Sequence, residues 1–191
     1  MNVVIVYDSL FGNTRAVAEA IAAGARSATS GPVRCAAIGS VVPMDVESAD
    51  LLAVGGPTHM LGLSSRRSRG TYLRREDMTA GRSRDGHTLE AGAEGPGLRE
   101  WLQGLPEAAP SRPPGAAAFD TRLHKVLAGS AARAIHRRLR RLGYRMVVPA
   151  ESFFVEGMEG PLPAGEIERA KEWGAALVQT YASVRSPRVE L

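Results

Sequence analysis

Apolar residues follow two patterns along the chain, short continuous runs and helical repeats. Continuous runs at residues 2–7, 33–38, 50–56 and 115–119 predict strands that are covered on both faces. Apolar residues three or four apart predict helices over residues 15–25, 97–105, 130–142 and 161–181. Residues 145–148 and 152–155 predict two halves of a fifth strand, interrupted at Pro149. Strands and helices that alternate in this order along the chain predict a parallel α/β sheet in a single domain.

A loop of small polar residues, Ser-Leu-Phe-Gly-Asn-Thr at positions 9–14, joins the first strand to the first helix. The first N–H groups of a helix lack partners within the helix and favour an anion. Ser9, Asn13 and Thr14 add side-chain donors, and Gly12 allows close approach of the backbone. The loop has neither the Lys of a G-x-x-x-x-G-K-[ST] loop nor a G-x-G-x-x-G pattern. It therefore predicts a site for a bound phosphate monoester, and the alternative is an ordinary capped turn between strand and helix.

These residues resemble a known family. Residues 9–14 are similar to the FMN-phosphate loop of flavodoxins, [ST]-x-[TF]-G-x-T, and Gly-Gly-Pro-Thr-His at 55–59 resembles their second flavin loop. The split last strand, followed by Gly157, is a further flavodoxin trait. The resemblance covers residues 1–182 and implies a flavodoxin-like three-layer sandwich. Its five-stranded parallel sheet has the order 2-1-3-4-5, with helices on both faces.

The resemblance also implies FMN as the cofactor, held by three loops at the carboxyl edge of the sheet. His59 stands where many flavodoxins have an aromatic residue, and it either contacts the flavin ring or is a surface histidine in a turn. The implied contacts are Ser9, Leu10, Phe11, Gly12, Asn13 and Thr14 for the phosphate, Pro57, Thr58, His59, Met60 and Gly62 for one side of the ring, and Phe119, Asp120, Thr121, Arg122 and Lys125 for the other.

Residues 64–95 depart from the family pattern. They contain seven arginines, many Gly and Ser residues and no clean period, and they predict an insertion or mobile flap with a short helical piece at 71–78. Such a segment can cover the flavin, dock an acidic partner or simply stay solvated. A second group of six arginines between residues 133 and 145 forms a basic ridge on a predicted helix. Residues 183–191 are expected to form a frayed tail.

Composition and charge indicate the class of protein and its expected location in the cell. The chain has 191 residues, 44% hydrophobic and 23% charged, with a net charge of +4, whereas flavodoxins are generally acidic. No apolar run reaches the ~20 residues of a membrane span, and no signal peptide is recognisable, so we expect a cytoplasmic protein without membrane contact. The lone Cys35 lies in an apolar run and is expected to be buried and inert. The basic charge permits contact with nucleic acid but does not indicate it.

Three functions are compatible with these residues. The first is an electron carrier that shuttles electrons between a reductase and an acceptor enzyme, with redox partners that present acidic docking surfaces. The second is an FMN-dependent reductase of quinones or similar molecules that uses NAD(P)H. The third is a flavin-free interaction or regulatory protein that has kept the fold. The sequence contains no convincing catalytic pair, which favours the carrier. The positive charge of Arg122, His124 and Lys125 near the flavin further predicts a higher reduction potential than that of acidic flavodoxins.

Overall fold

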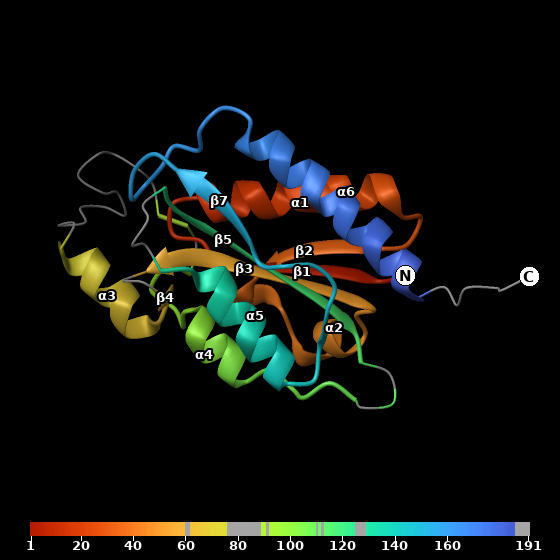
Figure 1. The fold of residues 1–191 in the computed structure, drawn as a ribbon. Helices are drawn as coiled ribbons and strands as arrows, with labels where there is room; N and C mark the ends of the chain where they lie inside the picture. Colours follow the sequence, from red (N-terminus) through yellow and green to blue (C-terminus); the bar gives the residue numbers. More distant parts are fainter. Residues whose placement is uncertain are drawn as a thin grey trace, which may run out of the picture.

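A central sheet between two layers of helices forms the protein (Figure 1). The computed structural model describes residues 1–59, 62–75, 89–90, 92–109, 111, 113–124 and 129–185. On one face of the sheet lie α1 and α6, and on the other lie α2, α4 and α5 (Figure 1). The helices are α1 (Asn13–Ala28), α2 (Pro43–Glu47), α3 (Arg66–Arg75), α4 (Leu98–Gln103), α5 (Ala131–Arg141) and α6 (Glu166–Arg185), with a short 3-10 helix at Ile38–Ser40.

The sheet confirms the predicted strand order. Its main path is β2-β1-β3-β5-β6, and β7 also pairs with β5, so that β5 is the fourth predicted strand and β6 and β7 are the two halves of the fifth. The pairings along this path are parallel, and among the described strands only β4 pairs antiparallel, with the end of β3. The strands are β1 (Val3–Tyr7), β2 (Val33–Ala37), β3 (Leu51–His59), β4 (Gly62–Leu63), β5 (Gly115–Leu123), β6 (Arg145–Met146) and β7 (Glu151–Val155).

Two strands run further than the hydrophobic pattern predicts. The predicted third and fourth strands stop at residues 56 and 119, whereas β3 continues to His59 and β5 to Leu123. The pairing between them includes Gly56 with Asp120 and Pro57 with Thr121. The residues expected in the second and third flavin loops therefore lie side by side on the ends of two neighbouring strands.

The helix boundaries also differ at the edges of the predicted segments. α3 begins at Arg66, five residues before the short helical piece predicted at 71–78, and α2 was missed because it is only five residues long. α6 begins at Glu166 rather than 161 and continues to Arg185, so the predicted tail at 183–191 is helical in its first part. Residues 76–88 of the predicted insertion and 186–191 of the tail lie outside the described residues.

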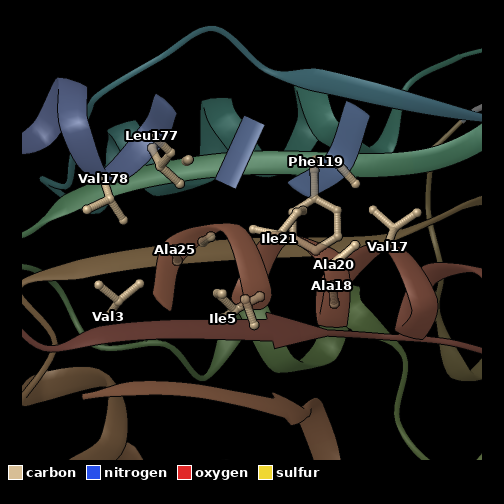
Figure 2. Close-up of a cluster of buried hydrophobic side chains, with 14 of the residues drawn as sticks. Val3, Ile5, Val17, Ala18, Ala20, Ile21, Ala25, Phe119, Leu177 and Val178 are labelled. Carbon is tan, nitrogen blue, oxygen red and sulfur yellow. The ribbon is translucent and has the colours of Figure 1, made fainter. Parts of the chain in front are cut away.

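One half of the core lies between the sheet and the pair α1 and α6. Figure 2 shows Phe119 of β5 facing Ile21 and Val17 of α1 across this layer. The two helices approach closely at glycines, because a Cβ on Gly24 would overlap the backbone of Lys171 and one on Gly174 would overlap that of Ile21. This packing fixes α1, and hence its N-terminus, against the carboxyl edge of β1.

Candidate functional site

No described side chain caps the N-terminus of α1, which follows directly on the first loop. Gly12 is the N-cap residue, with φ +89°, a conformation that favours glycine, and its cap position makes no side-chain hydrogen bond to the helix. Ser9 Oγ accepts a hydrogen bond of 3.1 Å from the Gly12 amide, which tightens the loop ahead of the helix. The first-turn amides are therefore not capped by a side chain, as an anion site requires.

A cavity of about 360 Å³ joins this loop to the ends of β3 and β5. Its volume falls within the range of about 300–1,000 Å³ that is usual for small-molecule sites. Hydroxyl and amide groups of the first loop are combined with apolar side chains from other elements. The lining residues are Ser9, Leu10, Phe11, Asn13, Thr14, Pro57, Thr58, His59, Ser68, Thr71, Thr121, Arg122, Leu123, Val155 and Met158.

Hydrogen bonds made by side chains hold the cavity walls together. Thr14 Oγ1 of α1 lies 2.7 Å from Thr121 Oγ1 of β5, and both residues are buried. Asn13 Nδ2 donates to the Glu159 carbonyl at 2.7 Å, which ties the loop after β7 to the first loop. Within a pair of hydroxyls only one O–H is used in the shared bond, so the pair retains one O–H for a ligand.

Asp120 joins the end of β3 to α5. Its Oδ2 accepts hydrogen bonds from Thr58 Oγ1 at 3.0 Å, Ser130 Oγ at 2.8 Å and the Ala132 amide at 2.9 Å. Ser130 Oγ in turn accepts a hydrogen bond from the Arg133 amide, which makes Ser130 the N-cap of α5. A carboxylate at the start of a helix is favoured by the helix dipole. Asp120 is fully buried and supports the cavity from behind.

The structure brings together most of the residues that the resemblance implied, but not all. Ten of them line the cavity: Ser9, Leu10, Phe11, Asn13, Thr14, Pro57, Thr58, His59, Thr121 and Arg122.

Four others lie elsewhere. Phe119 has no exposed surface and packs edge-to-face on Phe153 and Trp173, so its place is the core rather than the cavity wall. Asp120 is the buried support described above, Gly12 shapes the turn and Gly62 lies in β4. Met60 and Lys125 are outside the described residues.

Sequence reasoning missed two groups of lining residues. Ser68 and Thr71 come from α3, and Leu123, Val155 and Met158 come from the ends of β5 and β7 and the loop that follows. The stretch around α3 has no apolar period that could have shown which of its residues face the cavity.

His59 lines the cavity as a neutral imidazole. Burial, reinforced by the charge of Arg69, lowers the pKa of His59 from 6.5 to about 4. Its Nδ1 lies 3.4 Å from Ser68 Oγ on α3. His59 therefore contributes polarity but no charge to the cavity near neutral pH.

A buried ion pair lies directly behind the first loop. Arg69 Nη2 is 2.8 Å from Asp8 Oδ1, and the side chains are only 3% and 1% exposed. Burial raises the pKa of the Asp8 carboxyl, while the Arg69 guanidinium acts in the opposite direction. Nothing in the sequence distinguishes Arg69 from the six other arginines between residues 64 and 95.

The described residues offer neither a reactive cysteine nor a metal-binding cluster. Cys35 on β2 is half-buried, and burial raises the pKa of its thiol to about 11, so it carries little thiolate at neutral pH. Within the described ranges, no group of three or more His, Cys, Asp or Glu side chains could hold a metal ion. Nor does any helix in those ranges have the length and apolarity needed to cross a membrane.

Comparison with known proteins supports the same fold. No protein-family model matches the chain. A flavodoxin of Aquifex aeolicus is 45% identical over 58 residues, which are 30% of this chain and 31% of that protein. The match thus spans less than a third of the curated relative.

Solved structures match over nearly the whole chain. A flavodoxin from the domain Archaea aligns with a TM-score of 0.63 and 18% identity, covering 95% of this chain and 99% of that one. The oxidised flavodoxin 1 of Bacillus cereus aligns with a TM-score of 0.60 and 15% identity, covering 94% and 98%. The chain therefore has a flavodoxin-like fold.

Proposed function

We propose that the protein binds FMN in the cavity between α1, β3 and β5 and acts as an electron carrier. The observation that carries the proposal is the convergence of an uncapped helix N-terminus with the ends of two further parallel strands on one cavity. The residues present fit FMN, because amides and hydroxyls suit a phosphate and the apolar remainder suits a flat ring. The flavodoxins similar to this chain support the same cofactor.

Each part of the cavity has a task in this proposal. The first-turn amides of α1, with Ser9 and the Thr14–Thr121 hydroxyl pair, bind the phosphate. Pro57, His59 and other lining residues orient the ring and exclude water from it. The bound flavin supplies the redox chemistry.

The lining favours a carrier over an enzyme. Among its described residues, only His59 and Arg122 have ionisable side chains, and the lowered pKa of His59 makes it a poor proton donor near neutral pH. A carrier needs no acid or base, since its task is to hold the flavin and present it to a partner. We therefore propose shuttling between a reductase and an acceptor protein.

The charge of α5 suggests the kind of partner. Arg133, Arg137, Arg140 and Arg141 are exposed on this helix, and α5 contains no acidic residue. The helix begins at the cavity edge, where the Ala131 amide donates to Thr58 Oγ1 at 2.9 Å. A partner with an acidic surface would be steered to this side by long-range attraction.

Two other functions are kept as alternatives. A reductase that uses NAD(P)H is favoured by the exposed Arg66 and Arg67 on α3, beside the cavity, where they could contact a phosphate of the nucleotide. Steady NAD(P)H oxidation by the isolated protein would establish that function and exclude a simple carrier. A flavin-free interaction protein would be indicated by failure to bind FMN.

The first experiment is an absorbance spectrum of the purified protein, followed by titration of the flavin-free protein with FMN. We expect flavin bands and binding that weakens when Ser9 and Thr14 are replaced with alanine. Thr180→Ala, on α6 and outside the cavity lining, is the matched control and should leave binding unchanged. Absence of flavin bands and of FMN binding would overturn the proposal.

A further inference from the structure

Arg69 connects α3 to the residues just before the first loop. Its Nη2 donates to Asp8 Oδ1 at 2.8 Å and to the Ser9 carbonyl at 3.4 Å. Arg69 and Asp8 are 61 positions apart in the sequence. Only 3% of Arg69 is exposed, which is unusual for a side chain on a helix of this polarity. A buried charge of this kind is tolerated only when it is paired and hydrogen-bonded.

The same guanidinium also binds the C-terminal end of the segment between β4 and α4, residues 64–97. Its Nη1 donates to the Pro96 carbonyl at 2.8 Å and, at 3.4 Å, to the carbonyls of Gly92 and Gly95. Ser64, at the start of the segment, donates to Asp8 Oδ2 and accepts from the Leu98 amide at 3.0 Å. The buried Asp8–Arg69 pair is thus hydrogen-bonded to both the beginning and the end of this segment, directly behind the first loop.

The position of α3 matters for the cavity. Ser68 is next to Arg69 in the chain and lines the cavity, as does Thr71. Ser68 Oγ also lies 3.4 Å from His59 Nδ1 at the end of β3. Any movement of Arg69 away from Asp8 would therefore carry a cavity wall and the partner of His59 with it.

The geometry points to Arg69 as the positioning residue of a fourth wall of the FMN site, formed by Ser68 and Thr71 of α3. Arg69 itself does not line the cavity; it acts through Asp8 on the first loop and through α3 on the wall. Occupation of the first loop and ordering of α3 are coupled, so each should favour the other. This inference rests on the proposed binding of FMN.

The primary test replaces Arg69→Gln in the full chain and measures FMN affinity well below the unfolding temperature. We expect the dissociation constant to rise about tenfold or more, and iodide to quench the bound flavin more efficiently, because a wall has been released. Arg99→Gln is the matched control: Arg99 is exposed on α4, outside the cavity lining, and should change neither quantity.

A second set of variants separates positioning from a general loss of stability. In the wild-type background, Ser68→Ala should weaken FMN binding. In the Arg69→Gln background it should have no additional effect, because the wall is already displaced. Equal effects of Ser68→Ala in the two backgrounds would overturn the inference. Arg69→Lys, which keeps the charge but not the fork of donors, should restore only part of the affinity.

A measurement on the unmutated protein covers the case in which Arg69→Gln does not fold. FMN should slow amide hydrogen exchange in residues 66–71 as well as in residues 12–16, because the coupling is reciprocal. Protection of 12–16 without any at 66–71, or a wild-type affinity in a folded Arg69→Gln, would overturn this inference while leaving FMN binding intact. Failure of the wild type to bind FMN would instead overturn the proposed function.

Discussion

Thr14 and Thr121, which are 107 positions apart, share a hydrogen bond of 2.7 Å between their hydroxyl oxygens. Thr14 belongs to the first turn of α1, and Thr121 lies near the end of β5. The bond fixes the distance between the proposed phosphate loop and the proposed ring-binding strand.

Replacing Thr121→Val should therefore weaken FMN binding while preserving the fold. Valine has nearly the same shape but no longer holds the Thr14 hydroxyl in place, so the phosphate loses about the equivalent of one well-oriented hydrogen bond, which costs about 0.5–1.5 kcal/mol, or roughly 2- to 12-fold in affinity. Isothermal titration with FMN measures the change. Thr180→Val on α6 is the control, and an unchanged affinity for Thr121→Val would argue against a role for the hydroxyl pair.

The close contact between Gly55 and Phe119 predicts a second outcome. A Cβ at Gly55 would overlap the ring of Phe119, which has no exposed surface. Gly55→Ala should destabilise the protein by about 1–3 kcal/mol through overpacking. Urea denaturation measures this loss of unfolding free energy.

The matched control for that variant is Gly39→Ala, because no atom lies within 4 Å of a Cβ built there. The double variant Gly55→Ala, Phe119→Leu should recover part of the stability, since leucine leaves room for the added methyl group. A simple sum of the two single effects would indicate that the overlap is not the cause.

His59 predicts a pH dependence of stability. Its pKa is lowered from 6.5 to about 4 in the folded protein, so between these values the unfolded chain binds a proton that the folded protein does not. The contribution of His59 to the unfolding free energy should therefore be fully present above about pH 6.5. It should fall as the pH is lowered towards 4, by at most about 3 kcal/mol.

Urea denaturation at several pH values, compared between wild type and His59→Gln, isolates this contribution. The raised pKa of Asp8 acts in the opposite direction, and the lowered pKa of His136 acts in the same direction, but both remain in the variant and cancel in the difference. A difference that does not change between pH 4 and 6.5 would contradict the assignment.

Arg122 predicts the direction of a change in redox potential. Its side chain lines the cavity and lies over the ring of Phe154 at 5.5 Å, and a cation there favours the more negative, reduced flavin. Arg122→Gln should lower the reduction potential of bound FMN, by about 40 mV for each kcal/mol of charge stabilisation lost. A spectroscopic redox titration checks this. Arg26→Gln, at the opposite end of α1 from the cavity, should leave the potential unchanged.

Much of the fold could be predicted because it depends on local pattern. Continuous apolar runs identified the strands, and the strand order followed from the flavodoxin resemblance of residues 9–14 and 55–59. Such signals need only neighbours in sequence to be recognised.

The roles of Phe119 and Asp120 required the three-dimensional structure. Successive residues of a strand point to opposite faces, so once β5 continues to Leu123, Phe119 and Thr121 face α1 while Asp120 faces α5. The sequence predicted a loop from residue 119 onward, and in a loop this alternation does not apply. The end of the strand, set by its pairing with β3, decided which residue enters the core and which enters the cavity.

The sequence by itself determined the layered sheet, the order of its strands and the polar loop at the start of α1. Only the tertiary structure decided that one arginine of the basic stretch would be buried, because its burial depends on a carboxylate 61 residues away and on carbonyl groups at the far end of the same segment. Hydrophobic periodicity reports which face of an element is covered, whereas a buried ion pair depends on which distant groups the fold brings within hydrogen-bonding distance.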